Sequence, residues 1–173
     1  PIMQDIERDA GRRFAETPFS FVATAEPTSG HTISLHLRTG FASLAWHDRR
    51  PVGFILARLE EGAGYVAELS VRCDWGRRGC GRALMAAAES WLAEQGADSA
   101  WLTTFTDIPW NAPWYADQGY QNVVTADRPA WLNRIMDRQA LDDRLDPVAR
   151  SAMVKSLPPD TDRDQSGPAP GRR

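Results

Sequence analysis

The sequence has few cysteines, no long apolar run and no excess of positive charge, and each of these absences excludes a class of protein. Cys73 and Cys80 are its only cysteines, and their spacing is typical of neither a disulfide-rich scaffold nor a zinc knuckle. No stretch is apolar over the length of a transmembrane helix, and acidic residues interrupt the start too early for a signal peptide. We therefore expect a cytoplasmic protein with reduced cysteines and no membrane partner.

A nucleic-acid partner and a bound metal are also disfavoured. The net charge is −3 and the pI is near 5.6, whereas a surface that binds nucleic acid is usually strongly basic. The three histidines show no metal-ligand spacing. One dense basic cluster is present, and it consists of Arg72, Arg77, Arg78 and Arg82.

Length and composition predict one domain followed by a tail. A chain of 173 residues, 42% of them hydrophobic, is long enough for one well-packed core and short for two. From Pro158 onward the chain is Pro, Gly and charged residues, which cannot bury enough apolar surface to order themselves. We expect a domain over residues 1–157 and a disordered tail over 158–173.

Hydrophobic spacing predicts helices and strands in an α/β order. An amphipathic helix is expected over 2–14, followed by a loop rich in Thr, Pro, Ser and Gly. Strands are expected over 41–47, 52–59, 65–71 and 99–105, with a long helix over 79–95. The strand-helix-strand order across 65–105 predicts a parallel pair with a right-handed crossover. Strict alternation in 65–71 would place Ala67, Leu69 and Val71 on one face and Val66, Glu68 and Ser70 on the other.

The last part of the domain is expected to be a short helix and two strands. Asn111 is expected to cap the helix, and Gly119 to end it. The strands are expected over 120–125 and 151–157, with a partly helical segment over 127–146 between them.

A glycine-rich basic loop before the long helix carries the strongest functional signal. From Gly76 to Gly81 the chain combines glycines with arginines, and it then opens a helix whose free N–H groups attract anions. The loop is therefore typical of a phosphate site. It is not a Walker A loop, because Arg82 and Ala83 stand where Lys and a hydroxyl residue are required. It is not a dinucleotide fingerprint either, because Leu84 occupies the third glycine position.

The same loop resembles the acetyl-CoA signature of the GNAT N-acetyltransferase superfamily. Gly79 and Gly81 match that signature, whereas Gly76 stands where the family has Gln or Arg. About 30 residues further on, the segment 111–120, with its Trp-Tyr pair and Gly-Tyr end, resembles the family's second signature. Both segments occur in the family's order and separation. The element order also fits, except that the family's first strand has no counterpart before the first helix.

The resemblance implies an α/β fold with a mixed central sheet flanked by helices, whose central strands splay apart and hold coenzyme A. It implies transfer of the acetyl group from acetyl-CoA, the co-substrate, to a primary amine by direct attack. Tyr115 would protonate the leaving thiolate, Glu68 would be the base, and a backbone N–H near Val71 would polarise the thioester carbonyl. The implied cofactor-binding residues are Leu69, Ser70, Val71, Arg77, Arg78, Gly79, Cys80, Gly81, Arg82 and Asn111.

These residues also have structural alternatives. The loop could be a glycine-rich turn with solvated arginines. The ring of Tyr115 could simply pack in the core, and Glu68 could be a solvated or ion-paired strand residue. Asn111 could be only a helix cap, and we expect Cys80 to be a packing residue. An acceptor pocket or the core are the two possible places for Trp110, Trp114 and Trp131.

Two classes of function stay open on the sequence alone. The first is an acetyltransferase for a small-molecule, peptide or protein amine, and the second is a non-catalytic acyl-CoA-binding or regulatory module on the same fold. Tyr115 and Glu68 favour the enzyme. A toxin that acetylates charged tRNA is disfavoured by the acidic balance. The acceptor depends on segments 16–34 and 127–146, which carry no motif, and a homodimer is compatible with the sequence.

Overall fold

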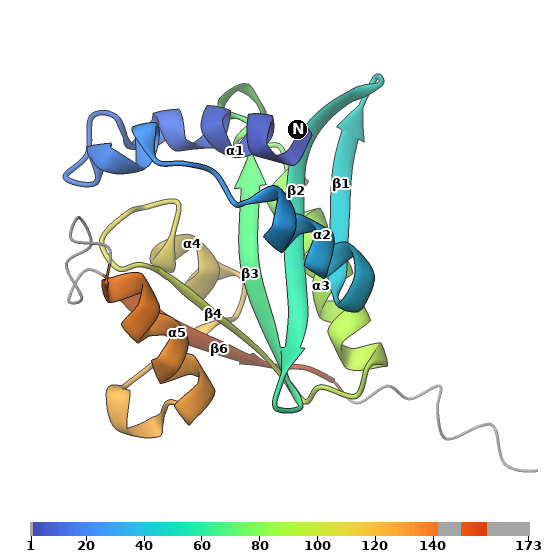
Figure 1. Ribbon diagram of the computed structural model, residues 1–173, viewed down its shortest axis with the longest axis vertical. Helices are drawn as coiled ribbons and strands as arrows, with labels where there is room; N and C mark the ends of the chain where they lie inside the picture. Colours follow the sequence, from blue (N-terminus) through green and yellow to red (C-terminus); the bar gives the residue numbers. More distant parts are fainter. Residues whose placement is uncertain (1, 142–149, 159–173) are drawn as a thin grey trace, which may run out of the picture.

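A computed structural model describes residues 2–141 and 150–158, which form a six-stranded mixed sheet with helices on both faces (Figure 1). The strands are β1 (Phe41–His47), β2 (Arg50–Glu60), β3 (Ala63–Val71), β4 (Ser99–Phe105), β5 (Gln121–Val123) and β6 (Arg150–Ser156). They lie in the order β1-β2-β3-β4-β6-β5. The pair β3–β4 is parallel and the other neighbours are antiparallel. The predicted α/β class and the parallel pair are confirmed.

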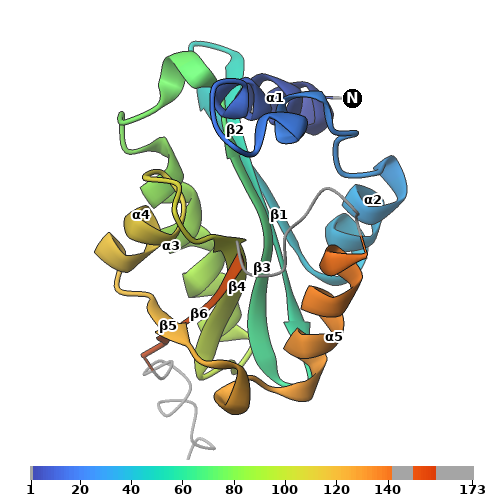
Figure 2. The same cartoon turned by 90° about the vertical axis from the view of Figure 1, so that its left-hand side faces the viewer.

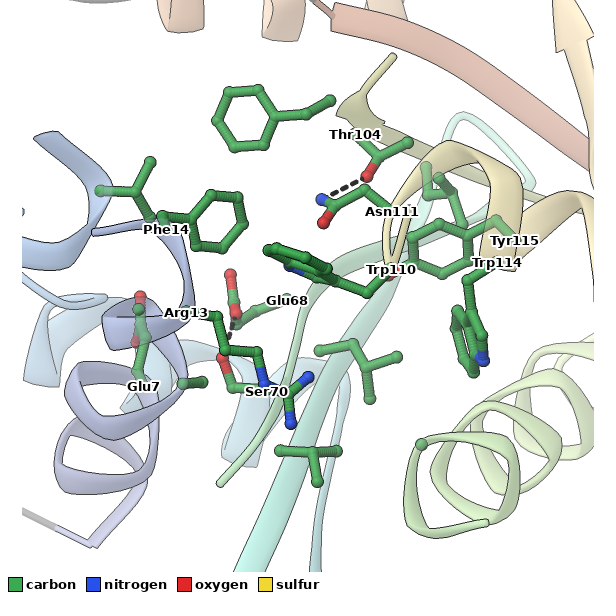
Figure 3. A pocket seen from close by; sticks show the side chains of 18 of the residues that line it. Glu7, Arg13, Phe14, Glu68, Ser70, Thr104, Trp110, Asn111, Trp114 and Tyr115 are labelled. Atoms are coloured by element: carbon green, nitrogen blue, oxygen red, sulfur yellow. Dashed lines mark hydrogen bonds between the residues drawn. The ribbon is translucent and has the colours of Figure 1, made fainter. Parts of the chain in front are cut away.

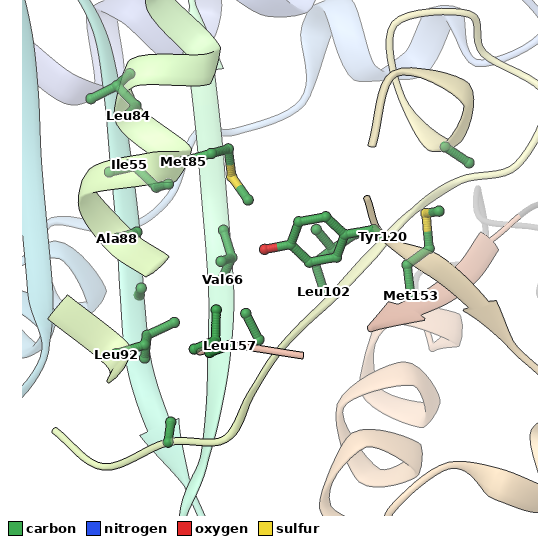
Figure 4. Close-up of a cluster of buried hydrophobic side chains, with 14 residues drawn as sticks. Ile55, Val66, Leu84, Met85, Ala88, Leu92, Leu102, Tyr120, Met153 and Leu157 are labelled. Carbon is green, nitrogen blue, oxygen red and sulfur yellow. The ribbon is translucent and has the colours of Figure 1, made fainter. Parts of the chain in front are cut away.

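Helices cover both faces of the sheet, so its central strands are buried on both sides. Helices α1 (Ile2–Gly11), α2 (Gly30–Thr39) and α5 (Ala130–Ala140) lie on one face, and α3 (Cys80–Glu94) and α4 (Ala112–Asp117) on the other (Figure 2). Strand β2 shows the consequence. Phe54 and Leu56 pack against α1, whereas Ile55 and Ala57 pack in the larger cluster beneath α3 (Figure 4). The apolar stripe expected on α3 belongs to that cluster and includes Leu84, Met85, Ala88 and Leu92.

Helix α2 corrects the loop that the sequence predicts after the first helix. Its N-terminus is capped by Ser29, whose hydroxyl accepts a hydrogen bond from the Thr32 N–H at 3.1 Å. His36 faces inward and is only 2% exposed, whereas Leu35 and Leu37 are 41% and 62% exposed. The apolar residues therefore do not follow the buried face, which hides the helical period in the sequence. Within residues 2–40 the structure has helices and no strand.

The two central strands pair at one end and separate at the other. Strand β3 contacts β4 only at Gly64–Ala100 and Tyr65–Trp101, although β4 pairs with β6 along its whole length. Figure 1 shows β3 and β4 diverging toward α1, which crosses the open end of the sheet. The edge of β3 beyond Tyr65 therefore faces a gap, as expected for splayed strands.

A β-bulge in β3 corrects the predicted alternation of its side chains. Ala57 pairs with Val66 and Leu56 pairs with Glu68, so Ala67 is an extra residue. Val66 consequently packs beneath α3 together with Leu69 and Val71, whereas Ala67 lies on the other face. Strict alternation was wrong because a bulge shifts the register by one residue, and the local sequence has no glycine to signal it.

Two further expectations concern the last third of the chain. Helix α4 begins after Asn111 and is followed by Gly119 at a φ of 90°, but the Asn111 side chain makes no capping bond, so the predicted cap is wrong. The tail predicted over 158–173 lies outside the described residues except for Pro158. Among the helices that the structure describes, none has the length and apolar character needed to cross a membrane.

Candidate active site

A cavity of about 680 Å³ lies where β3 and β4 diverge (Figure 3). This size is typical of sites for small ligands, which occupy roughly 300–1,000 Å³. The cavity is lined by most of the residues predicted for the site, namely Glu68, Leu69, Ser70, Val71, Arg77, Gly79, Gly81, Arg82, Asn111 and Tyr115. Arg78 and Cys80 do not line it. Strand β3, the glycine-rich loop and α4 thus bring residues from distant parts of the chain to one place.

The glycine-rich loop has the backbone of an anion site. Gly79 has a φ of 81° and Arg77 a φ of 60°, and turns of this handedness aim successive N–H groups into a concavity. No side chain caps α3, and the bond from Ala83 N to Gly79 O, 3.0 Å, closes its first turn. The N–H groups before Ala83 have no helical acceptor. A Cβ atom built at Gly79 meets no atom within 4 Å, so the loop is open on this side.

The two predicted loop residues outside the cavity have other contacts. The guanidinium of Arg78 lies 4.7 Å from the centre of the Trp75 ring. Cys80 packs against the core beneath α3, and burial raises the pKa of its thiol. A thiol with a raised pKa is a poor nucleophile at neutral pH, which agrees with the packing role expected for Cys80.

The edge of β3 offers main-chain groups to the cavity. Arg72 N donates to Val52 O of β2 at 2.9 Å. In an antiparallel ladder, alternate residues direct their N–H and C=O groups at the same neighbour, so Ser70 also points at β2. Leu69 and Val71 then direct theirs at the gap that β4 leaves. An extended ligand in the gap could bind these groups as an added strand would.

Glu68 presents a carboxylate with an unusual pKa to the same cavity. Burial raises the pKa of Glu68 to about 7, and the charge of Glu7 on α1 adds to the increase. A hydrogen bond from Ser70 Oγ, 2.7 Å, and the charge of Arg150 act in the opposite direction. Such a carboxylate exchanges a proton near neutral pH, as a general base must.

Tyr115 is the tyrosine whose side chain lines this cavity. Of the other two, Tyr65 lies at a separate groove on the α5 side, and Tyr120 donates its hydroxyl hydrogen bond to Glu89 at 3.0 Å. Burial raises the pKa of Tyr115, and the charge of Glu68 adds to the increase. The phenol therefore stays protonated at neutral pH and can act as a proton donor.

Asn111 and the tryptophans occupy defined places around the cavity. Asn111 Nδ2 donates to Thr104 Oγ1 of β4 at 2.8 Å, which ties the start of α4 to the diverging strand (Figure 3). Trp110 and Trp114 line the cavity, whereas Trp131, on α5, is buried between that helix and the sheet. Of the two places that the sequence left open, Trp110 and Trp114 thus lie at the cavity and Trp131 lies in the core.

Sequence reasoning missed the contribution of α1 and of β6. Glu7, Ala10, Gly11 and Phe14 line the cavity, and their spacing places them on one helical face. Arg13 Nη2 donates to Arg72 O at 3.2 Å, which fixes this segment to the end of β3. Arg150 lines the cavity from β6. A helical-wheel count would have found the α1 face, but no local signal marks Arg150.

Within residues 2–141 and 150–158, no group of three or more His, Cys, Asp and Glu side chains is placed to hold a metal ion.

Comparison with known proteins defines the class of this fold and site. The sequence profile of the family described as "Acetyltransferase (GNAT) family" matches residues 4–120, more than half of the chain. The chain therefore belongs to the GNAT acetyltransferase family. The predicted family and fold are confirmed.

Solved structures of similar fold include three acetyltransferases. One is N-acetylglutamate synthase from Neisseria gonorrhoeae, complexed with coenzyme A and N-acetyl-glutamate; the TM-score is 0.61 and the identity 18% over 76% of this chain, which spans only 28% of that one. The ribosomal-protein-S18-alanine N-acetyltransferase from Escherichia coli has a TM-score of 0.57 and 17% identity, over 89% of this chain and 84% of that one. PaiA N-acetyltransferase from Thermoplasma acidophilum, in complex with coenzyme A, has a TM-score of 0.61 and 12% identity, over 88% of this chain and 89% of that one. At these identities the likeness shows the fold.

Proposed function

We propose that this chain is an acetyl-CoA-dependent N-acetyltransferase that acts on a primary amine. The observation that carries the proposal is the meeting of a base, an acid and an anion site in one cavity. Glu68 on β3, Tyr115 on α4 and the loop 76–82 all line it. The similar structures support the same class, since one is an S18-alanine N-acetyltransferase and another is complexed with N-acetyl-glutamate.

The residues of the loop and of β3 fit coenzyme A. The N–H groups at the start of α3, with Arg77 and Arg82 beside them, suit a pyrophosphate. The unpaired main-chain edge at Leu69 and Val71 suits the amides of a pantetheine arm. Asn111, held by Thr104, lies on the opposite wall. Three other predicted residues hold this surface in place: Arg78 packs on Trp75, Cys80 packs in the core, and Ser70 lies on β3 between Leu69 and Val71.

The chemistry then follows from the positions of two side chains. When bound, acetyl-CoA supplies the acetyl group as a thioester. Glu68, with a pKa of about 7, accepts a proton from the attacking amine nitrogen. Tyr115 Oη donates a proton to the departing thiolate sulfur, which its raised pKa permits because the phenol is protonated beforehand. The N–H of Val71 donates to the carbonyl oxygen as negative charge develops there.

Three aromatic side chains lie together in the wall of the cavity. The ring of Phe14 lies 5.5 Å from that of Phe105 and 5.7 Å from that of Trp110. These rings come from the segment after α1, from β4 and from the loop before α4. An apolar wall of this kind lowers the local dielectric constant and so strengthens electrostatic interactions beside it.

The test separates cofactor binding from turnover. Calorimetry measures coenzyme A affinity, and thiol release from acetyl-CoA measures transfer to a panel of amino acids, amines and peptides. We expect micromolar binding of coenzyme A and thiol release with at least one acceptor. Glu68→Gln and Tyr115→Phe should lose the thiol release and keep the coenzyme A binding. Tight binding of coenzyme A without thiol release for any acceptor would instead identify a non-catalytic module. Absence of coenzyme A binding would refute both.

A further inference from the structure

Arg150 holds a positive charge in the wall of the cavity, and none of the proposed steps uses it. It begins β6 and pairs with Phe105 at the end of β4. Its Nη2 donates to Thr103 Oγ1 at 3.2 Å and to Thr103 O at 3.5 Å, and its guanidinium lies 5.0 Å from the centre of the Phe105 ring. These contacts fix the position of the guanidinium but bring no anion to it.

The hydrogen-bonding capacity of this guanidinium is not fully used. Its Nε is buried and has no hydrogen-bond partner, and it is the single such side-chain atom found in the described part of the chain. Buried donors in folded proteins are almost always paired, and a buried charge without a partner is costly. Burial also lowers the pKa of Arg150, which reflects the same cost. An anionic ligand in the cavity would compensate the charge of the guanidinium.

Arg150 and Glu68 have opposite charges and line the same cavity without pairing. The charge of Arg150 lowers the pKa of Glu68 and of Tyr115, so it lies near both. Nevertheless, Ser70 is the one hydrogen-bond donor to the Glu68 carboxylate among the described side chains. Two opposite charges held apart in a cavity suit a ligand with an ammonium group at one end and a carboxylate at the other.

Two other charged residues that line the cavity, Glu7 and Arg13, are held by hydrogen bonds within the protein. Glu7 accepts bonds from Thr28 N and Thr28 Oγ1, each at 3.0 Å, and burial raises its pKa. Arg13 donates to the carbonyl oxygens of Arg72 and Cys73. Glu68 and Arg150 form no salt bridge with a described residue, and the positive charge of Arg150 disfavours a dication.

We propose that the acceptor is an amine that itself carries a carboxylate, such as a free amino acid, with its amino group at Glu68 and its carboxylate at Arg150. This inference rests on the proposed acetyltransferase function. It makes Arg150 a specificity residue, because an acceptor without the carboxylate leaves the charge of the guanidinium without an anionic partner among the described residues.

The experiment measures binding in the absence of turnover. The protein is saturated with coenzyme A, and the protein L-amino acids are titrated by calorimetry. For each one that binds, its carboxamide is titrated as well. We expect binding of at least one acid, with the carboxamide at least about 30-fold weaker, because a charge-assisted pair is lost. This acid–amide comparison uses the wild-type protein and needs no variant.

Variants then assign the effect to one side chain. Arg150→Gln should reduce the affinity for the acid to that for the amide, and Arg150→Lys should retain part of it, because Lys keeps the charge without the planar fork. Arg12→Gln is the matched control, since Arg12 is exposed beside Asp9 and does not line the cavity, and it should change nothing. Melting temperature and coenzyme A affinity verify that the variants are folded.

The outcomes separate the two proposals. Equal or tighter binding of the carboxamide or of 1,4-diaminobutane, or binding of none of the amino acids, would overturn the carboxylate site. If amines that lack a carboxylate give thiol release and amino acids give none, the proposed carboxylate site is wrong and the proposed acetyltransferase function still stands. Arg150-dependent binding of an acid without thiol release would uphold the site and refute the transferase.

Discussion

Glu7 on α1 and Glu68 on β3 line the same cavity, and the negative charge of Glu7 raises the pKa of Glu68. Glu7 is held in place by the N–H and hydroxyl of Thr28, in the segment before α2. The first helix therefore does more than cover the sheet. Through Glu7 it also raises the proton affinity of the candidate base, which links the fold of the N-terminal segment to the pH at which the site can act.

Replacing Glu7 should move the pH dependence of catalysis. Burial is the larger cause of the raised pKa of Glu68, and Glu7 is the second, so Glu7→Gln removes only part of the shift. We expect the acidic limb of the kcat/KM profile, near pH 7 in the wild type, to move toward lower pH. Asp5→Asn, on the exposed side of the same helix, should leave the limb in place. An unmoved limb in Glu7→Gln would show that another group controls it.

Glu68 should also make stability depend on pH. Its pKa rises from 4.5 to about 7 on folding, so the folded state holds more protons than the unfolded state between these values. Stability is therefore lost as pH rises from about 4.5 to 7, by up to about 3 kcal/mol, and changes little above that. Glu68→Gln should melt higher than the wild type at pH 8 and similarly at pH 4. Glu94→Gln on the exposed surface of α3 is the control, and equal melting curves for Glu68→Gln and wild type at pH 8 would contradict the raised pKa.

Loss of the Tyr115 hydroxyl should affect kcat far more than binding. Tyr115→Phe keeps the ring and its packing against Trp114 and Tyr120. If the hydroxyl protonates the leaving thiolate, kcat should fall by roughly 10²- to 10⁴-fold with little change in coenzyme A affinity. Tyr120→Phe is the matched control, because it removes the bond to Glu89 outside the cavity and should lower stability only. Retention of most of the kcat in Tyr115→Phe would rule out this role.

Alanine substitutions at two glycines with similar backbone angles should distinguish the loss of ligand binding from the effect of backbone strain. Gly79 in the loop has a φ of 81°, and Gly62 in the β2–β3 turn has a φ of 89°; a Cβ at either meets no atom within 4 Å. Alanine at each should therefore cost about 1 kcal/mol of stability. Gly79→Ala should also weaken coenzyme A binding about tenfold or more, whereas Gly62→Ala should not. Equal coenzyme A affinities in calorimetry would place the pyrophosphate elsewhere.

The neighbouring arginines of the loop should differ in the same assay. Arg77 lines the cavity, whereas Arg78 lies over the Trp75 ring. Arg77→Ala should weaken coenzyme A binding by about tenfold, the scale of one hydrogen bond to a charged group. Arg78→Ala should leave the affinity close to that of the wild type. The reverse order of affinities would show that the loop rearranges when the ligand binds.

The sequence by itself determined the features that depend on neighbouring residues. The boundaries of β1 at 41–47 and β4 at 99–105 were predicted correctly, because apolar runs bounded by turn residues identify buried strands. The left-handed turn at Gly79 and the short helix carrying Tyr115 were also predicted, because positive φ angles favour glycine and both segments match family signatures.

Tertiary structure alone decided which distant residues meet. Helix α2 depends on the burial of His36, the bulge at Ala67 on pairing with β2, and the Asn111 bond to Thr104 on the divergence of β4. Glu7 and Arg150 are far from Glu68 along the chain, and no local pattern marks either one as part of its surroundings. The pKa of Glu68 follows from burial and from these two charges, which are properties of the assembled cavity and of no single segment.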